Sequence, residues 1–141
     1  MNTVLAIVGA AAMIALFVAF ESWQRKRKLE RAFAGRASLG SEQFYEAYFK
    51  ERGIPFHIVS GVRSILEELL SADLSRLVDS DDFSKNLSFF WDFDSMADVE
   101  IVCALEERFA IKISDAEAEQ TKTIADIVDL VHSKSSAPNA A

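Results

Sequence analysis

Asp94 and Ser95 are the residues whose types and position best suit a chemical role. They open a segment, running to Phe109, in which apolar and acidic residues recur at helical spacing. A serine at a helix N-terminus is exposed, and the helix dipole and free backbone N–H groups favour an attached anion there. Ser95 also has capping-box spacing to Asp98, which needs no modification. The pattern therefore suits an anionic group beside Ser95 as well as a helix cap.

The helix that Asp94 or Ser95 opens is expected to be amphipathic. Its predicted core face holds Met96, Val99, Val102, Cys103, Leu105 and Phe109, and its predicted solvent face holds Asp98, Glu100, Glu106 and Glu107. Because Cys103 is the single cysteine, no disulfide forms within the chain, which agrees with a reducing compartment. Its apolar neighbours predict a small buried hydrophobe and not a reactive thiol.

Three further helices are expected around it in a domain at 57–134. The first buries Ile58, Val62, Ile65, Leu66, Leu69 and Leu70 and exposes Arg63, Glu67 and Glu68. Capping-box spacing predicts a short helix at Ser114 with Glu117 and a last helix at Thr123 with Asp126. This last helix buries Ile124, Ile127, Val128 and Val131. The tail, 135–141, is expected to be disordered.

Residues 71–91 show no helical period and are expected to form a long structured loop held by Leu74, Leu77, Phe83 and Leu87. The acidic residues at 79–82 do not favour calcium, because Phe83 and Phe90 stand where an EF-hand needs ligands. His57 and His132 lie on different elements, with no nucleophile or metal-ligand spacing near either. The chain is therefore expected to be a substrate of enzymes and not an enzyme.

An aromatic stripe precedes this domain, at 41–56. Ser41 is the predicted N-cap of a helix with Phe44, Tyr45, Tyr48 and Phe49 on one face, and Gly53 with Pro55 ends it. We assign the stripe to packing against the following domain. A surface facing a partner or lipid is the alternative.

Residues 4–20 form an uninterrupted apolar run, and the first charge is Glu21. About 17 to 25 apolar residues span a bilayer core, and Trp23 suits the interface. A cleaved signal peptide is the alternative, but no basic residue precedes the run and no clear cleavage site follows it. We expect a membrane anchor at 1–23.

A basic cluster follows the anchor at 25–28, with Arg31 and Arg36 close behind. The positive-inside rule places such a cluster, and the domain after it, in the cytoplasm. The same residues could hold anionic lipid headgroups, although a role in orientation alone explains them. Residues 24–40 are expected to continue the membrane helix as a stalk until Gly35 or Gly40 breaks it.

Charge divides the chain: residues 1–36 carry +4 and the remainder −11 of the net −7. An acidic domain is repelled by nucleic acid and by anionic membranes, so nucleic acid is not expected as a partner. Its partners should present basic patches. The roughly 95 residues beyond the stalk suffice for one small core.

The segment from Asp94 onward resembles the second-helix motif of the acyl carrier protein family. That motif, Asp-Ser-Leu, then Val-Glu, then Leu-Glu-Glu-x-Phe, is met by residues 94–96, 99–100 and 105–109. Residues 111–119 and 122–129 resemble the family's third and fourth helices. The resemblance covers about 58–134 and implies a four-helix acyl-carrier-like bundle. With the transmembrane helix and the one extra helix that the sequence pattern predicts before it, the expected fold is all-α.

The resemblance also implies a function and its residues. Ser95 would receive 4′-phosphopantetheine from coenzyme A, and the thiol of this arm would carry an acyl or aminoacyl group as a thioester. Asp94 would help to bind magnesium during the transfer. Asp98, Glu100, Glu106 and Glu107 would form an acidic face for a phosphopantetheinyl transferase and a basic synthase or acyltransferase.

The chain departs from the family just before the serine. Asp92 replaces a glycine, Asn86-Leu87 replaces Asp-Leu, and extra residues that include Phe89, Phe90, Trp91 and Phe93 lie before Asp94. These rings either fill the core beneath the loop or dock a partner, for which Phe90 and Trp91 are the candidates. Two functions follow: a membrane-tethered carrier, or a carrier-like domain without the arm that serves as an anchored interaction module.

Overall fold

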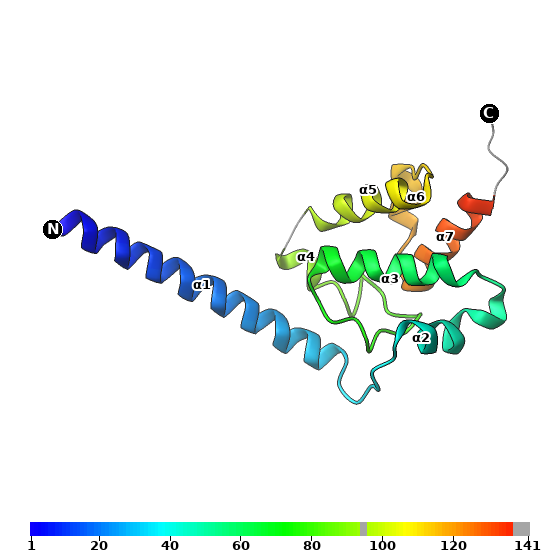
Figure 1. Cartoon of the computed structure of the whole chain (residues 1–141), viewed down its shortest axis with the longest axis horizontal. Helices are drawn as coiled ribbons and strands as arrows, with labels where there is room; N and C mark the ends of the chain where they lie inside the picture. The colour runs from blue at the N-terminus through cyan, green and yellow to red at the C-terminus, as the bar shows by residue number, and fades with distance from the viewer. Residues whose placement is uncertain (94–95, 137–141) are drawn as a thin grey trace. The chain divides into compact units, whose positions relative to one another are not determined.

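In the computed structural model the chain is helical, as predicted, and the structure describes residues 1–93 and 96–136 (Figure 1). Within these ranges the only β-type pairing is an isolated antiparallel bridge between Asp82 and Thr123. The chain divides into two compact units, Met1–Ala34 and Gly35–Ala141.

The first unit is built on one long helix, α1 (Asn2–Ala32). Its 31 residues cover the apolar run and about half of the expected stalk. Its length and an 18-residue window with a mean hydropathy of 2.6 make it a candidate membrane span. A signal sequence near an N-terminus meets the same criteria. The helix ends where the Phe33 N–H donates to the Leu29 carbonyl (3.0 Å), just before Gly35, whose φ is +76°.

The second unit begins with α2 (Ser41–Tyr48) and a short 3-10 helix, η1 (Lys50–Arg52). The predicted N-cap at Ser41 is wrong by one residue: Gly40 is the cap, and its N–H donates to Oε1 of Gln43 (3.0 Å). The predicted inward packing of the aromatic stripe is confirmed for Phe44 and Phe49, which are buried, whereas Tyr45 and Tyr48 are half-buried. Gly53, with φ of +73°, ends the segment as expected.

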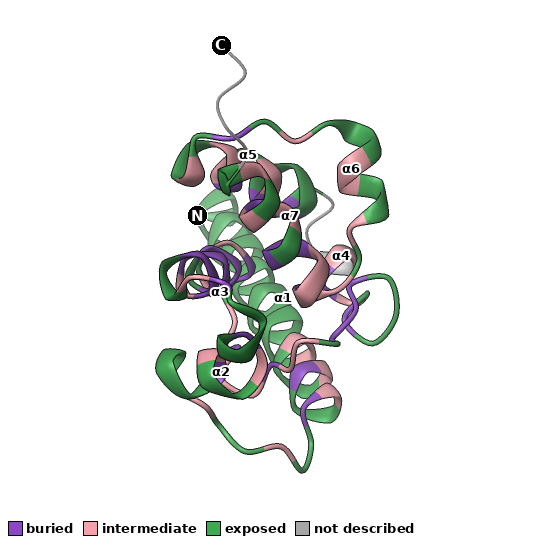
Figure 2. Ribbon diagram, turned by 90° about the vertical axis from the view of Figure 1, so that its right-hand side faces the viewer, coloured by how far each residue is buried: buried purple, intermediate pink, exposed green. Residues whose placement is uncertain are grey.

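Helix α3 (Phe56–Leu70) is the centre of the second unit: it packs against α2 on one side and against α5 and α7 on the other (Figures 1 and 2). The prediction that Arg63 faces solvent is wrong, because its side chain is buried. Its guanidinium donates to the carbonyls of Leu39 (2.6 Å) and Gly40 (3.3 Å) and lies over the Phe44 ring. The extra helix thus covers the face that the sequence pattern assigns to water.

The long loop after α3 is held as predicted, since Leu74, Leu77, Phe83 and Leu87 are all buried. Three backbone hydrogen bonds attach it to the start of the last helix: Phe83 N–H to the Lys122 carbonyl (2.9 Å), Ile124 N–H to the Asp81 carbonyl (3.1 Å) and Ala125 N–H to the Asp79 carbonyl (2.9 Å). The Ser84 hydroxyl, which donates to Asp82, lowers the pKa of that carboxyl. A short helix, α4 (Phe90–Phe93), ends the loop and was not predicted.

Three helices complete the unit: α5 (Ala97–Phe109), α6 (Asp115–Gln120) and α7 (Ile124–Ser136). Both predicted capping boxes are present, with Glu117 N–H donating to Ser114 Oγ (3.2 Å) and Asp126 N–H donating to Thr123 Oγ1 (3.0 Å). The four predicted core residues of α7 are buried. The predicted disordered tail starts too early, because Ser135 and Ser136 are helical; the rest of it lies outside the described residues.

Gly61 of α3 allows the close approach of α5. A Cβ atom at this position would lie 2.7 Å from Cζ of Phe109. We therefore expect Gly61→Ala to destabilise the second unit by about 1–2 kcal/mol in urea denaturation, because overpacking outweighs the gain in helix propensity. Ser64→Ala, at an exposed position of the same helix, should be neutral or stabilising. A cost for Gly61→Ala that persists unchanged in a Phe109→Leu background would contradict this explanation.

Candidate functional site

Asp94 and Ser95 lie outside the described residues, so the structure does not decide between a cap and an attachment site for Ser95. The described helix begins directly after them. Met96 precedes the first residue of α5, and its carbonyl accepts the Glu100 N–H (3.1 Å). In the first turn, Oδ1 of Asp98 accepts the Val99 N–H (2.8 Å). Ser95 therefore immediately precedes the first hydrogen-bonded turn of a 13-residue helix.

The core face of α5 differs from the predicted one. Ala97, Ile101 and Leu105 are buried at a spacing of four residues. Met96 and Val99 are 56% and 49% exposed, and Cys103 is exposed as well, so their assignment to the core is wrong. Val102 and Phe109 are half-buried. Only Leu105 among the predicted set is fully in the core.

The error has a physical cause. Met96, Val99 and Cys103 follow one another at helical spacing, as do Ala97, Ile101 and Leu105, so the helix carries two apolar stripes and only one of them can pack on α3. The stripe that begins with the small Ala97 is the buried one. The other, Met96, Val99 and Cys103, is an exposed apolar stripe that begins next to Ser95.

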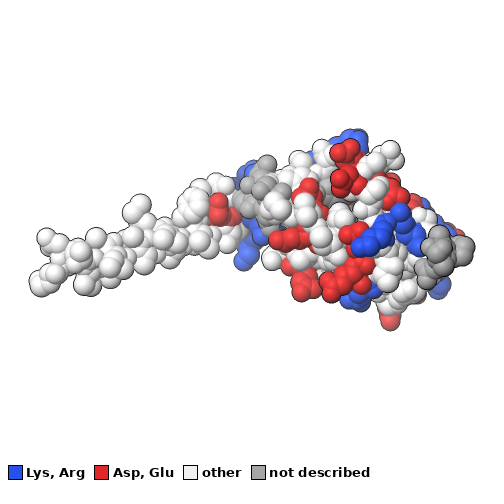
Figure 3. Space-filling model, turned by 90° about the horizontal axis from the view of Figure 1, so that it is seen from above, with Lys and Arg blue, Asp and Glu red and all other residues white. Residues whose placement is uncertain are grey.

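The predicted acidic residues divide into two kinds. Asp98, Glu100 and Glu107 are exposed, whereas Glu106 is half-buried and its Oε2 accepts the Ile113 N–H (2.9 Å). Glu106 therefore stabilises the turn after α5. Acidic side chains gather on the face of the second unit that Figure 3 shows. Glu100 and Glu107, seven residues apart, lie on one side of α5.

The aromatic segment before the serine contributes to the core. Phe90 is buried, and its ring stacks on Phe89 at a centroid distance of 4.5 Å and lies 6.3 Å from that of Phe83. Trp91 is half-buried, and its Nε1–H donates to the Phe83 carbonyl (3.0 Å). Phe89 and Trp91 are therefore partly exposed, whereas Phe90 is not.

Comparison with known proteins identifies the family. Residues 60–131 match the family described as the phosphopantetheine attachment site. The chain belongs to the acyl carrier protein family. An acyl carrier protein of Thermosynechococcus vestitus is 36% identical over 77 residues, which are 55% of this chain and 90% of that protein. Another, from Helicobacter hepaticus, is 40% identical over 67 residues, covering 48% of this chain and 83% of that protein.

A third acyl carrier protein, from Cyanidioschyzon merolae, is 40% identical over 86 residues, covering 58% of this chain and 88% of that protein. Membership of the family implies a covalently attached 4′-phosphopantetheine. The described residues fit such a group: the first turn of α5 is exposed at Met96, Asp98 and Val99, and a helix N-terminus suits a phosphodiester. The family match begins within α3, so α1, α2 and η1 lie outside it.

The exposed apolar stripe of α5 is the part of the site that sequence reasoning missed. The signal was present in the spacing of Ala97, Ile101 and Leu105. Two alternative stripes of similar length made that signal ambiguous.

Proposed function

We propose that this protein is a membrane-tethered acyl or peptidyl carrier whose 4′-phosphopantetheine arm is attached to Ser95. The arm supplies a terminal thiol on which an acyl or aminoacyl group is held as a thioester. The observation that carries the proposal is that the family match spans residues 60–131, and within it Ser95 directly precedes in sequence the exposed first turn of α5. Asp94, next to it, is proposed to support the magnesium ion during transfer of the arm.

The proposed tether is α1. Its apolar window carries a mean hydropathy of 2.6 and is followed by Arg25, Lys26, Arg27 and Lys28, which favour a cytoplasmic second unit. A cytoplasmic position gives Ser95 access to coenzyme A. Tethering raises the local concentration of the carrier near membrane-bound synthases or acyltransferases.

The arm at Ser95 is tested by intact-mass measurement. After incubation of the full chain with coenzyme A, magnesium and a phosphopantetheinyl transferase, we expect a gain of one phosphopantetheinyl group, and no gain in Ser95→Ala. Ser88→Ala, an exposed serine in the preceding loop, is the matched control and should be modified like the unaltered chain.

Two results would contradict the proposal. A gain that persists in Ser95→Ala would place the arm elsewhere. No gain in the unaltered chain with several transferases would favour the alternative of an anchored interaction module without the arm.

A further inference from the structure

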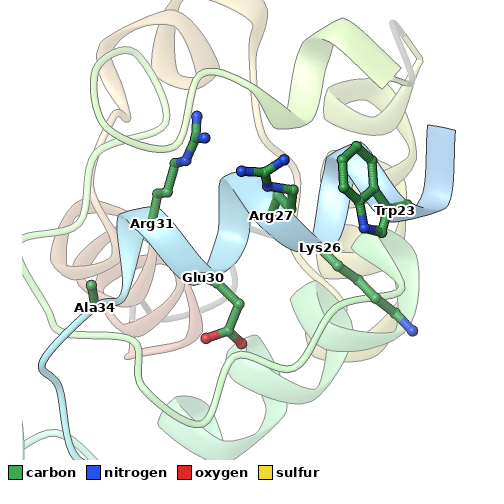
Figure 4. A pocket seen from close by; sticks show the side chains of 6 residues that line it. All are labelled: Trp23, Lys26, Arg27, Glu30, Arg31 and Ala34. Carbon is green, nitrogen blue, oxygen red and sulfur yellow. The ribbon is translucent and has the colours of Figure 1, made fainter. Parts of the chain in front are cut away.

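The last turns of α1 carry a cluster of basic residues beside an exposed tryptophan. A pocket on the helix surface is lined by Trp23, Lys26, Arg27, Glu30, Arg31 and Ala34 (Figure 4). Trp23, Arg27 and Arg31 extend from the same side of the helix in this view, as their spacing of four residues requires. We call Trp23, Lys26, Arg27 and Arg31 the juxtamembrane cluster.

The chemistry of the juxtamembrane cluster suits a phosphate. Three cations and the Glu30 carboxylate leave the pocket lining with a net charge of +2. Arg27 and Arg31, one turn apart, repel one another, and an anion between them would relieve this repulsion. Guanidinium groups bind phosphate through paired hydrogen bonds.

Trp23 contacts one of the basic side chains of the juxtamembrane cluster. The guanidinium carbon of Arg27 lies 4.7 Å from the centroid of the Trp23 ring, a cation–π contact. Tryptophan is enriched where hydrocarbon meets headgroups, because its ring is apolar and its N–H is polar. A position of the Trp23 indole at the membrane interface would therefore place the neighbouring basic residues near the lipid headgroups.

The position of the cluster along α1 fits the headgroup layer. At about 1.5 Å per residue, the segment 2–23 is about 33 Å long, close to the roughly 30 Å of a hydrocarbon core. With Trp23 at the boundary, Arg27 lies about 6 Å and Arg31 about 12 Å further along the helix. The headgroup region extends about 5–8 Å beyond the core, so the backbone of Arg27 is at the depth of lipid phosphates. The backbone of Arg31 lies about 4 Å or more beyond this region, and its long side chain would have to reach back to contact a phosphate.

We propose that the juxtamembrane cluster binds the phosphate of an anionic phospholipid. This inference rests on the proposed insertion of α1 in a membrane, and it is independent of the arm at Ser95. An anionic lipid held here would fix the depth at which α1 leaves the membrane. Because the rest of the chain is strongly acidic, such binding would also counter its repulsion from an anionic surface.

The test uses the full chain in nanodiscs of phosphatidylcholine and phosphatidylglycerol in equal amounts. Native mass spectrometry of the released protein gives the ratio of the two lipids that remain bound. We expect phosphatidylglycerol to be preferred, and we expect Arg27→Ala/Arg31→Ala to reduce the preference by about fivefold or more beyond the loss in the control variant, since the paired guanidinium–phosphate hydrogen bonds are lost together with the charges. Arg27→Lys/Arg31→Lys should retain part of it.

The matched control is Arg25→Ala/Lys28→Ala, which removes the same charge from the same helix segment at residues that do not line the pocket. General surface attraction applies to Arg25 and Lys28 as well, so this control should lose part of the lipid preference, but several-fold less than Arg27→Ala/Arg31→Ala. An equal loss in both double variants would overturn the site in favour of general surface potential. Release of phosphatidylglycerol by inorganic phosphate would assign the cluster to free phosphate and also overturn it.

A different measurement tests whether α1 is a membrane tether at all. Extraction of the protein from membranes by alkaline carbonate would show that α1 is not inserted. This result would contradict both the tether and the lipid site. An integral protein without lipid preference would overturn the lipid site alone. The mass gain at Ser95 is measured independently of both.

Discussion

Asp81→Asn is expected to lower the free energy of unfolding of the second unit by about 3 kcal/mol. The Asp81 carboxylate is only 2% exposed and accepts two hydrogen bonds from Arg36 Nη1, at 2.8 and 3.0 Å. It also accepts the Val78 N–H (2.9 Å) and Nδ2 of Asn86 (2.9 Å). One buried side chain therefore joins the segment before α2 to two points of the long loop.

The large cost follows from burial. An asparagine at this position keeps one acceptor oxygen but presents an NH₂ group to donors, and it removes the negative charge that Arg36 requires. The Arg36 side chain and Val78, which would lose an acceptor, are half-buried, so part of their desolvation is not recovered. The backbone carbonyl of Asp81 also accepts Ile124 N–H, so movement here would extend to the start of α7.

Urea denaturation of the full chain in detergent, followed by far-ultraviolet circular dichroism, measures the effect. Asp129→Asn is the control, because Asp129 forms a similar two-oxygen contact with Arg52 (2.9 and 2.8 Å) but both side chains are more than 40% exposed. Exposed pairs contribute about 0–1 kcal/mol, so the control should have a small effect. Equal costs for the two variants would show that burial is not the cause.

Sequence reasoning predicted the elements that depend on local rules. The capping boxes at Ser114 and Thr123 formed as expected because the side chain and the N–H that it accepts lie three residues apart. The buried residues of α7 and of the loop followed from single apolar stripes and from isolated leucines between polar residues.

The predictions failed where tertiary packing determines which residues are buried. Arg63 is buried because α2, which the carrier pattern does not include, covers it, and its long side chain reaches the carbonyls of Leu39 and Gly40. The face of α5 depended on which of two apolar stripes packs against Gly61 and its neighbours on α3. Neither outcome is contained in the periodicity of one helix.

The exposed apolar stripe and acidic residues of α5 lead to the last prediction, which concerns recognition by basic enzymes. We expect Glu100→Lys/Glu107→Lys to slow phosphopantetheine transfer to the chain by about 10- to 100-fold at low salt, through a reduced association rate. Both side chains are exposed, so the change should not affect stability. Glu106 is left unaltered because its Oε2 accepts the Ile113 N–H, and its loss would disturb the turn after α5.

The matched control is Glu42→Lys/Glu51→Lys, which makes the same change of net charge at exposed positions on α2 and η1. If the enzyme contacts α5, this control should slow transfer by no more than about threefold, and added salt should reduce the difference between the two variants because the attraction is screened. Equal slowing by both pairs would mean that the enzyme responds to the net charge of the domain. It would remove the argument that Glu100 and Glu107 form a specific contact surface beside Met96 and Val99.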